Sequence, residues 1–257
     1  MHGAMGRVVR AQGGGAVPSG MGDGARIRRL GLRTAAPMDA MAAFYGDTMG
    51  LRVERLRENA LLVHAGLTEI TFISALPEDG EPYYHFAFNI PENKITAAHD
   101  WQAERTALVP TPEHMLDPEY PAGVRHFRNW NAHSVFFRDP AGNILEHIAR
   151  HTLDNAQSGS FTPKDILYAS EIAFTSRDVP ATAKVLKERL FLPTYKTGSE
   201  QFHAVGDEHG LLLVFALDRI MIGDVPSRFY PTFASVKAGK DDLFMLPGAE
   251  HEIQARA

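Results

Sequence analysis

Hydrophobic and polar residues alternate in three short segments of the chain. These segments are Arg29-Leu30-Gly31-Leu32, His85-Phe86-Ala87-Phe88 and Glu171-Ile172-Ala173-Phe174. Alternation with a period of two predicts a strand that has one apolar face. Helix-like sequence follows each segment at a similar distance, beginning at Pro37, Glu92 and Val179. The pattern therefore indicates a repeated unit that opens with a strand and continues into a helix.

Further strand-like runs follow each predicted helix. They are LRVERL, ALLVHAG and TEITFISAL in the first unit, TALVP, HSVFFRDP and NILEHIAR in the second, and PTYKTG, EQFHAVG and GLLLVFALD in the third. Each unit thus reads strand–helix–strand–strand–strand. The sequence predicts an α+β fold built from repeated βαβββ modules.

The modules suggest a division of the chain. Modules at 26–76 and 83–150, with an insertion at about 106–130, are expected to form one domain over residues 26–153. A third, degenerate module with remnant strands is expected over 165–257, because PTFASVKAG looks like an opening strand but no helix-like run follows it. The glycine-rich residues 1–25 are expected to be a disordered tail. The third module is left without a partner module, so we expect it to be capped by the remnant strands or paired in a homodimer.

The stretch HSVFFRDPAGNILEHIAR, residues 133–150, combines a predicted hairpin with an isolated carboxylate. The sequence DPAGN has proline and glycine at positions where a tight turn favours them. Glu146 follows in the middle of the second apolar run. A carboxylate there is costly unless it reaches solvent, a cation or a ligand.

Strand parity indicates which face of its strand carries each of two polar side chains. Phe86 and Phe88 should pack beneath the helix, so His85 lies on the opposite face of its strand. Glu146 shares its face with Ile144 and Ile148. His85 and Glu146 are therefore the first candidates for catalytic residues.

Composition narrows the chemistry. The 257 residues carry a formal net charge of −5 and show no basic stripe, which argues against a nucleic-acid partner. The chain has no cysteine, so any metal must be held by histidine, aspartate or glutamate. No apolar run approaches the roughly 18 residues of a membrane span, and residues 1–25 lack the apolar core of a signal peptide. We expect a cytoplasmic protein with a small-molecule substrate and no membrane partner.

The chain resembles the vicinal oxygen chelate superfamily, which contains glyoxalase I, extradiol dioxygenases and bleomycin-resistance proteins. The resemblance depends on the βαβββ repeats and on the sequences AFYGDTMGL, HFAF and FFRDPAGNILE. It covers Arg26 to about Arg150 well and about Leu167 to Asp218 more faintly. It implies that two consecutive modules form a curved, half-open sheet around a cleft.

The resemblance also implies metal ligands on the first and last strands of the modules. His85 and Glu146 match two such positions, for Fe, Mn, Ni or Zn, and Arg29 replaces the histidine usual at a third. In a metal-free interpretation, Arg29 pairs with Glu146, and His85 acts as a hydrogen-bond donor or general base. Alternatively, Arg29 holds a substrate carboxylate or phosphate. The candidates for a third metal ligand are His64, Glu69, His133 and residues of the insertion.

Two further features leave alternatives open. Glu171 occupies the repeat position that matches His85, and we interpret it mainly as a solvated strand residue or an ion-pair partner rather than as a ligand. The insertion is either a lid or a structured surface loop. As a lid it would bring residues into the cleft, with Trp130 and Asn131 as substrate-binding candidates beside His114 and His126.

Two functional hypotheses follow. The first is a metalloenzyme of the glyoxalase type (lyase or isomerase) or of the ring-cleaving dioxygenase type, acting on a small organic molecule in the cleft of residues 26–150. The second is a metal-free binding protein similar to the bleomycin-resistance proteins. The retained His85 and Glu146 favour the enzyme, and Arg29 favours the binding protein.

Overall fold

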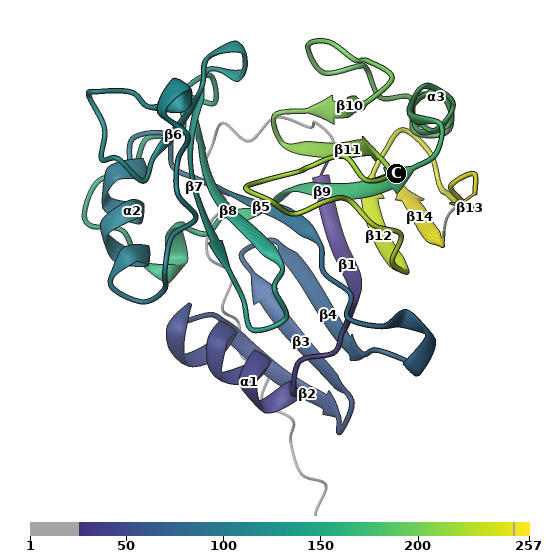
Figure 1. Cartoon of the computed structure of the whole chain (residues 1–257), viewed down its shortest axis with the longest axis horizontal. Helices are drawn as coiled ribbons and strands as arrows, with labels where there is room; N and C mark the ends of the chain where they lie inside the picture. Colours follow the sequence, from purple (N-terminus) through teal and green to yellow (C-terminus); the bar gives the residue numbers. More distant parts are fainter. Residues whose placement is uncertain (1–25, 249) are drawn as a thin grey trace, which may run out of the picture.

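The structure, a computed structural model, describes residues 26–248 and 250–257, which form two seven-stranded mixed sheets (Figure 1). The expected tail at residues 1–25 lies outside the described residues. The first sheet contains, in spatial order, β13 (Asp242–Met245), β14 (His251–Arg256), β12 (Thr232–Lys237), β1 (Arg26–Thr34), β4 (Thr68–Ser74), β3 (Ala60–Ala65) and β2 (Arg52–Arg57). The second contains β10 (Phe202–Asp207), β11 (Gly210–Ala216), β9 (Tyr168–Ser176), β5 (His85–Ile90), β8 (Ile144–Arg150), β7 (Ala132–Arg138) and β6 (Arg125–Phe127).

Helices follow the opening strand of the first three units. They are α1 (Met38–Ala43), which continues as a π-helical turn over Phe44–Thr48, α2 (Ile95–Ala103) and α3 (Val179–Leu190). Short 3-10 helices cover Pro77–Asp79, Glu113–Met115, Arg128–Trp130 and Pro163–Asp165. In Figure 1, α2 lies along β7 and β8, and α3 lies beside β10 and β11. The repeated βαβββ fold that the alternation predicted is confirmed.

The pairing of the units differs from the prediction. In the first sheet, β1 pairs with β12, so the first unit joins the C-terminal strands. In the second sheet, β5 pairs with β9, with Ala87 opposite Glu171, so the second unit joins the third. The expectation that the first two units enclose one cleft is therefore wrong. Alternation specifies which face of a strand is buried, but it does not specify the partner at the strand's edge.

The same pairing removes the argument for a homodimer. The third unit finds its partner unit within the chain, and the remnant strands β12, β13 and β14 complete the first sheet. The described part of the chain thus contains four units where the sequence suggested three modules and remnant strands, and the last unit, which opens with the PTFASVKAG strand, has no helix. The homodimer stays a prediction, and the strand pairing gives no reason to expect it.

The main hydrophobic core lies between the two sheets and beneath the helices. It contains Leu30, Phe72, Phe86 and Phe174, each about 1% exposed or less, from the central strands of both sheets. These are the apolar faces that the alternation predicted. The opposite face of β5, with His85 and Ala87, is left for the concave side of the second sheet.

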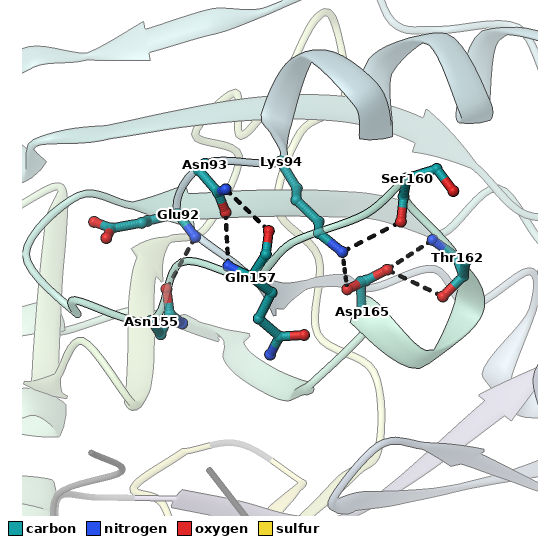
Figure 2. A network of polar contacts seen from close by, with 8 residues as sticks. All are labelled: Glu92, Asn93, Lys94, Asn155, Gln157, Ser160, Thr162 and Asp165. Atoms are coloured by element: carbon teal, nitrogen blue, oxygen red, sulfur yellow. Dashed lines mark hydrogen bonds and ion pairs between the residues drawn. The ribbon is translucent and has the colours of Figure 1, made fainter. Parts of the chain in front are cut away.

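The linker between the second and third units is anchored to the start of α2 (Figure 2). Lys94, buried at the helix N-terminus, donates to the Asp165 carboxylate at 2.6 Å and to the Ser160 carbonyl at 3.2 Å. Asp165 in turn accepts from the backbone N–H of Thr162 at 2.7 Å. Asn93 is bonded to Gln157 in both directions. These contacts hold the linker so that β9 enters the sheet beside β5.

No helix in the described ranges is both long and apolar enough to cross a membrane.

Candidate functional site

A cavity of about 260 Å³ opens on the concave face of the second sheet. Its walls combine a few ionisable groups with a mostly apolar and aromatic lining. The lining residues are His85, Phe127, Trp130, Phe136, Glu146, Glu171, Phe202, Leu213, Phe215, Arg219, Met221 and Ile222. A concave, largely apolar pocket with few convergent polar groups is the usual form of a small-molecule site.

The turn between β7 and β8 aligns the first two ionisable groups. Asp139 Oδ1 accepts from the backbone N–H groups of Ala141 and Asn143, and Gly142 has the positive φ of 79° that the turn requires. Asn143 Oδ1 then accepts from the backbone N–H of Tyr84 at 2.8 Å. This bond fixes the start of β5 against β8, so His85 lies beside Glu146.

His85 is buried, and its ring orientation is set by the backbone. Nδ1 lies 3.1 Å from the carbonyl oxygen of Ile144, which accepts its proton. Burial lowers the pKa of His85 to about 4, so the ring is neutral at pH 7. Nε2 then carries a lone pair directed into the cavity, 3.5 Å from Glu146 Oε2. A hydrogen-bonded Nδ1 and a free Nε2 are the arrangement found in metal-binding histidines.

Two buried carboxylates share the site. Burial raises the pKa of Glu146 well above its usual range, and the nearby carboxylate of Glu171 raises it further. Burial also raises the pKa of Glu171, while Arg150 lowers it. Two carboxylates this close are more stable when they share a proton or bind a cation than when both are ionised.

Arg150 stabilises one of the two carboxylates. Its guanidinium donates to Glu171 Oε1 through Nη2 and to Asn89 Oδ1 at 3.2 Å through Nε. The guanidinium also lies 5.6 Å from the ring centre of Trp130. Glu146 has no arginine at hydrogen-bond distance among the described residues, so it is the carboxylate with the greater need for a cation.

The residues present fit a divalent metal. One imidazole nitrogen of His85 and one carboxylate oxygen each from Glu146 and Glu171 lie within 4.8 Å of one another, and all three side chains are buried. Nitrogen and oxygen donors in this number suit Fe(II), Mn(II), Ni(II) or Zn(II), with positions left for substrate.

The structure brings His85 and Glu146 together as strand parity predicted. It also adds Glu171, which is 2% exposed and ion-paired with Arg150. Its interpretation as an ion-pair partner is therefore correct, and its interpretation as a solvated residue is wrong. The sequence did hint at this role, because Glu171 occupies the repeat position that matches His85. Placing Glu171 in the same site as His85 required knowing that β9 pairs with β5.

Arg29 does not lie in this cavity. It belongs to the first sheet, where its 65% exposed side chain pairs with Glu69 at 3.2 Å. The expected ion pair between Arg29 and Glu146 is not formed, because the first unit is not the partner of the second. Trp130 does line the cavity. Asn131 is exposed, has a left-handed backbone conformation with φ of 48°, and does not line it.

The other candidates for a third ligand lie elsewhere. His64 contacts Glu54 at 2.7 Å in the first sheet, and Glu69 is the partner of Arg29. His114 is exposed in the insertion. His126 and His133 lie on the opposite face of the second sheet, as described below. Sequence reasoning missed Arg219, which lines the cavity from the segment after β11.

No family model and no curated protein sequence matches the chain. Its structure is similar to that of a putative dioxygenase from Bacillus subtilis subsp. subtilis str. 168, with 14% identity, a TM-score of 0.55, and coverage of 90% of this chain and 84% of that chain. It is also similar to glyoxalase I from Zea mays, with 12% identity, a TM-score of 0.50, and coverage of 90% of this chain and 92% of that chain. At these identities the likeness concerns the fold alone.

Proposed function

We propose that this chain, which has the fold of the vicinal oxygen chelate superfamily, is a metal-dependent enzyme that acts on a small organic molecule. The observation that carries the proposal is the convergence of His85, Glu146 and Glu171 at the base of an apolar cavity. A purely structural site would not need two buried carboxylates beside a buried histidine whose Nε2 lies 3.5 Å from one of them.

The cavity walls support a substrate class. Arg219 lies over the rings of Phe202 and Phe215, with its guanidinium carbon 5.0 and 5.1 Å from the ring centres. It has ring contacts but no carboxylate partner among the described residues. We infer a flat, largely apolar molecule that carries an anionic group toward Arg219 and two adjacent oxygens toward His85 and Glu146.

A divalent ion bound at this site would polarise the oxygens of the substrate. The chain's own residues would supply the remaining chemistry. Arg150 lowers the pKa of Glu171 against the effect of burial, and neutral His85 presents its Nε2 lone pair. Glu146, whose pKa is raised, is suited to accept or return a proton at a carboxylate oxygen. The apolar walls exclude water from the base of the cavity. Such a site suits lyase or isomerase chemistry and ring cleavage alike.

The first test is metal content. Wild-type protein purified without chelator, measured by inductively coupled plasma mass spectrometry, should contain a transition-metal ion at the cavity that Glu146→Gln loses, so the variant should hold one ion per chain fewer than the wild type. The exposed carboxylate of Glu81 provides the control, because Glu81→Gln should keep that ion. Equal metal content in wild type and Glu146→Gln would contradict the proposal. Catechols and α-keto hemithioacetals are the substrates to assay with the loaded protein.

A metal-free binding protein of the bleomycin-resistance type is the second candidate. One observation favours it, because the ion pair between Arg150 and Glu171 already balances one carboxylate. A proton on Glu146 would balance the other. If the wild type takes up no Fe, Mn, Ni or Zn at the cavity but still binds aromatic anions, with binding weakened in Arg219→Met, this candidate replaces the enzyme.

A further inference from the structure

A second group of metal-type ligands lies on the outer face of the second sheet. Asp117, His126 and His133 each offer one ligand atom within 4.8 Å of the others. They come from the insertion, from β6 and from β7. Strand alternation separates this group from the cavity. Phe127 and Phe136, on the opposite faces of the same two strands, line the cavity.

The two histidines are preorganised by strand pairing. His126 and His133 are direct partners in the antiparallel pair of β6 and β7, so their Cβ atoms are held about 5 Å apart. Their rings stack with centres 4.2 Å apart, and Tyr120 stacks on the other side of His133 at 3.9 Å. Little conformational entropy remains to be lost when these side chains bind a common ligand.

A single carboxylate oxygen faces both rings. Asp117 Oδ2 lies 3.0 Å from His126 Nδ1 and 3.2 Å from His133 Nε2. Its other oxygen, Oδ1, accepts from the backbone N–H of Glu119 at 3.1 Å, which fixes the carboxylate plane. Ligand atoms about 2.1 Å from a tetrahedral zinc ion lie roughly 3.4 Å apart, so the two distances from Asp117 need to change by only a few tenths of an ångström, and the two imidazole nitrogens lie within 4.8 Å of each other.

A fourth side chain, that of His151, orients His133 through the ring nitrogen that does not face Asp117. His133 Nδ1 lies 2.7 Å from Nε2 of His151, which follows β8. A ligand histidine whose second nitrogen is hydrogen-bonded is the common arrangement at metal sites.

One atom of the group is left without a hydrogen bond. His126 Nδ1 is shielded from solvent and close to the Asp117 carboxylate, yet it lacks hydrogen-bond geometry to any partner. A buried polar nitrogen in this condition is costly, and a bound cation would satisfy it. Asp117, His126 and His133 are 16%, 17% and 6% exposed, which leaves room for a water ligand.

We propose that Asp117, His126 and His133 form a zinc site on the outer face of the second sheet, separate from the cavity, with His151 orienting His133. The donor set of two imidazoles and one carboxylate suits Zn(II), and a water molecule completes the tetrahedron. The site ties the insertion to β6 and β7. Because Phe127 and Trp130 of the same segment line the cavity, the zinc ion holds a cavity wall in place.

The test is a zinc titration of the full chain after removal of metal with a chelator. Wild type should bind zinc at the outer site with a stoichiometry of one, and Asp117→Asn and His126→Gln should each lose that ion. His151→Phe should retain it with affinity weakened about 10- to 100-fold. His114→Gln, an exposed histidine of the same insertion, is the matched control and should bind as wild type does.

The two metal sites are distinguished by their own variants. Glu146→Gln should lose only the cavity ion, and His126→Gln only the outer ion. Zinc should also slow amide hydrogen exchange of residues 113–127 in wild type and in Glu146→Gln, but not in His126→Gln. If zinc binding and exchange are the same in wild type, Asp117→Asn and His126→Gln, the group is a metal-free hydrogen-bond network and the inference is overturned. That result would leave the cavity site untouched.

Discussion

At the scale of single residues, two neighbouring positions of β8 lie on opposite faces of the sheet and differ in their roles. Glu146 points into the cavity, whereas the next residue, His147, is fully buried on the outer face. Its Nε2 contacts Gln102 Oε1 at 3.0 Å, and the rings of Phe137 and Phe161 surround it. His147 is a core residue with one ring nitrogen paired to Gln102 and the other, Nδ1, buried without a hydrogen-bond partner, so burial and partners, not residue type, decide its role.

His147 should make the protein sensitive to acid. Burial lowers its pKa to about 3, against 6.5 for a free imidazole. Between these values the unfolded chain binds a proton that the folded chain does not, so the free energy of unfolding falls as the pH falls from about 6.5 to about 3. His147→Phe should reduce the slope of unfolding free energy against pH in this window by about 1.4 kcal/mol per pH unit.

Urea unfolding at several pH values measures this slope. His114→Gln, which replaces an exposed histidine of the insertion, is the surface control for the substitution. An unchanged slope in His147→Phe would show that His147 is already protonated in the folded protein.

At the scale of elements, helices were easier to anticipate than connecting strands. The helix expected from Val179 begins there, and that expected from Glu92 begins at Ile95. The strand expected at TALVP forms only one bridge, between Leu108 and Phe137, and β6 takes its place after a long loop. Apolar periodicity reports on burial against one neighbour, whereas a short edge strand depends on contacts distant in sequence.

The ion pair that anchors the linker to the start of α2 gives a prediction at this scale. Lys94 and Asp165 form an ion pair with side chains 5% and 4% exposed. Removing one partner leaves a buried charge without compensation, so Lys94→Met should lower the free energy of unfolding by about 3–5 kcal/mol. The double variant Lys94→Met with Asp165→Leu should recover part of this loss, because no isolated charge remains.

Chemical denaturation compares these variants with a matched exposed pair. Lys184 lies 3.9 Å from Glu188 with both side chains more than 60% exposed, so Lys184→Met should change the stability by less than about 0.5 kcal/mol. Equal effects of the two lysine substitutions would mean that the Lys94–Asp165 pair contributes no more to stability than a surface ion pair does.

At the scale of the whole molecule, the two sheets interleave the halves of the chain. Each sheet contains strands from both sides of residue 153. In the first sheet β1 pairs with β12, and in the second sheet β5 pairs with β9. The hairpin between β3 and β4 also contacts the linker, where Leu67 N–H donates to the Leu167 carbonyl at 2.9 Å. At this contact Gly66 has a φ of 58°, and a Cβ there would lie 2.0 Å from the same oxygen.

A chain truncated after residue 153 should therefore fail to form a cooperative fold. Truncation exposes the edges of β1 and β5 and removes Glu171 from the cavity. Near-ultraviolet circular dichroism and urea unfolding of residues 26–153 should show weak tertiary structure and a broad transition, whereas residues 26–257 should unfold sharply. A sharp transition in the truncated chain would support the division into separate domains that the sequence suggested.

The sequence by itself determined the βαβββ repeat, the cavity-facing orientation of His85 and Glu146, and the turn that joins their strands. These features depend on local periodicity and turn geometry, which neighbouring residues specify. Only the tertiary structure decided that Glu171 completes the site, that Arg29 lies outside it, and that Asp117 meets His126 and His133. Those relations depend on which strand edges pair and on where a long loop folds back, and residues far apart in the chain set both.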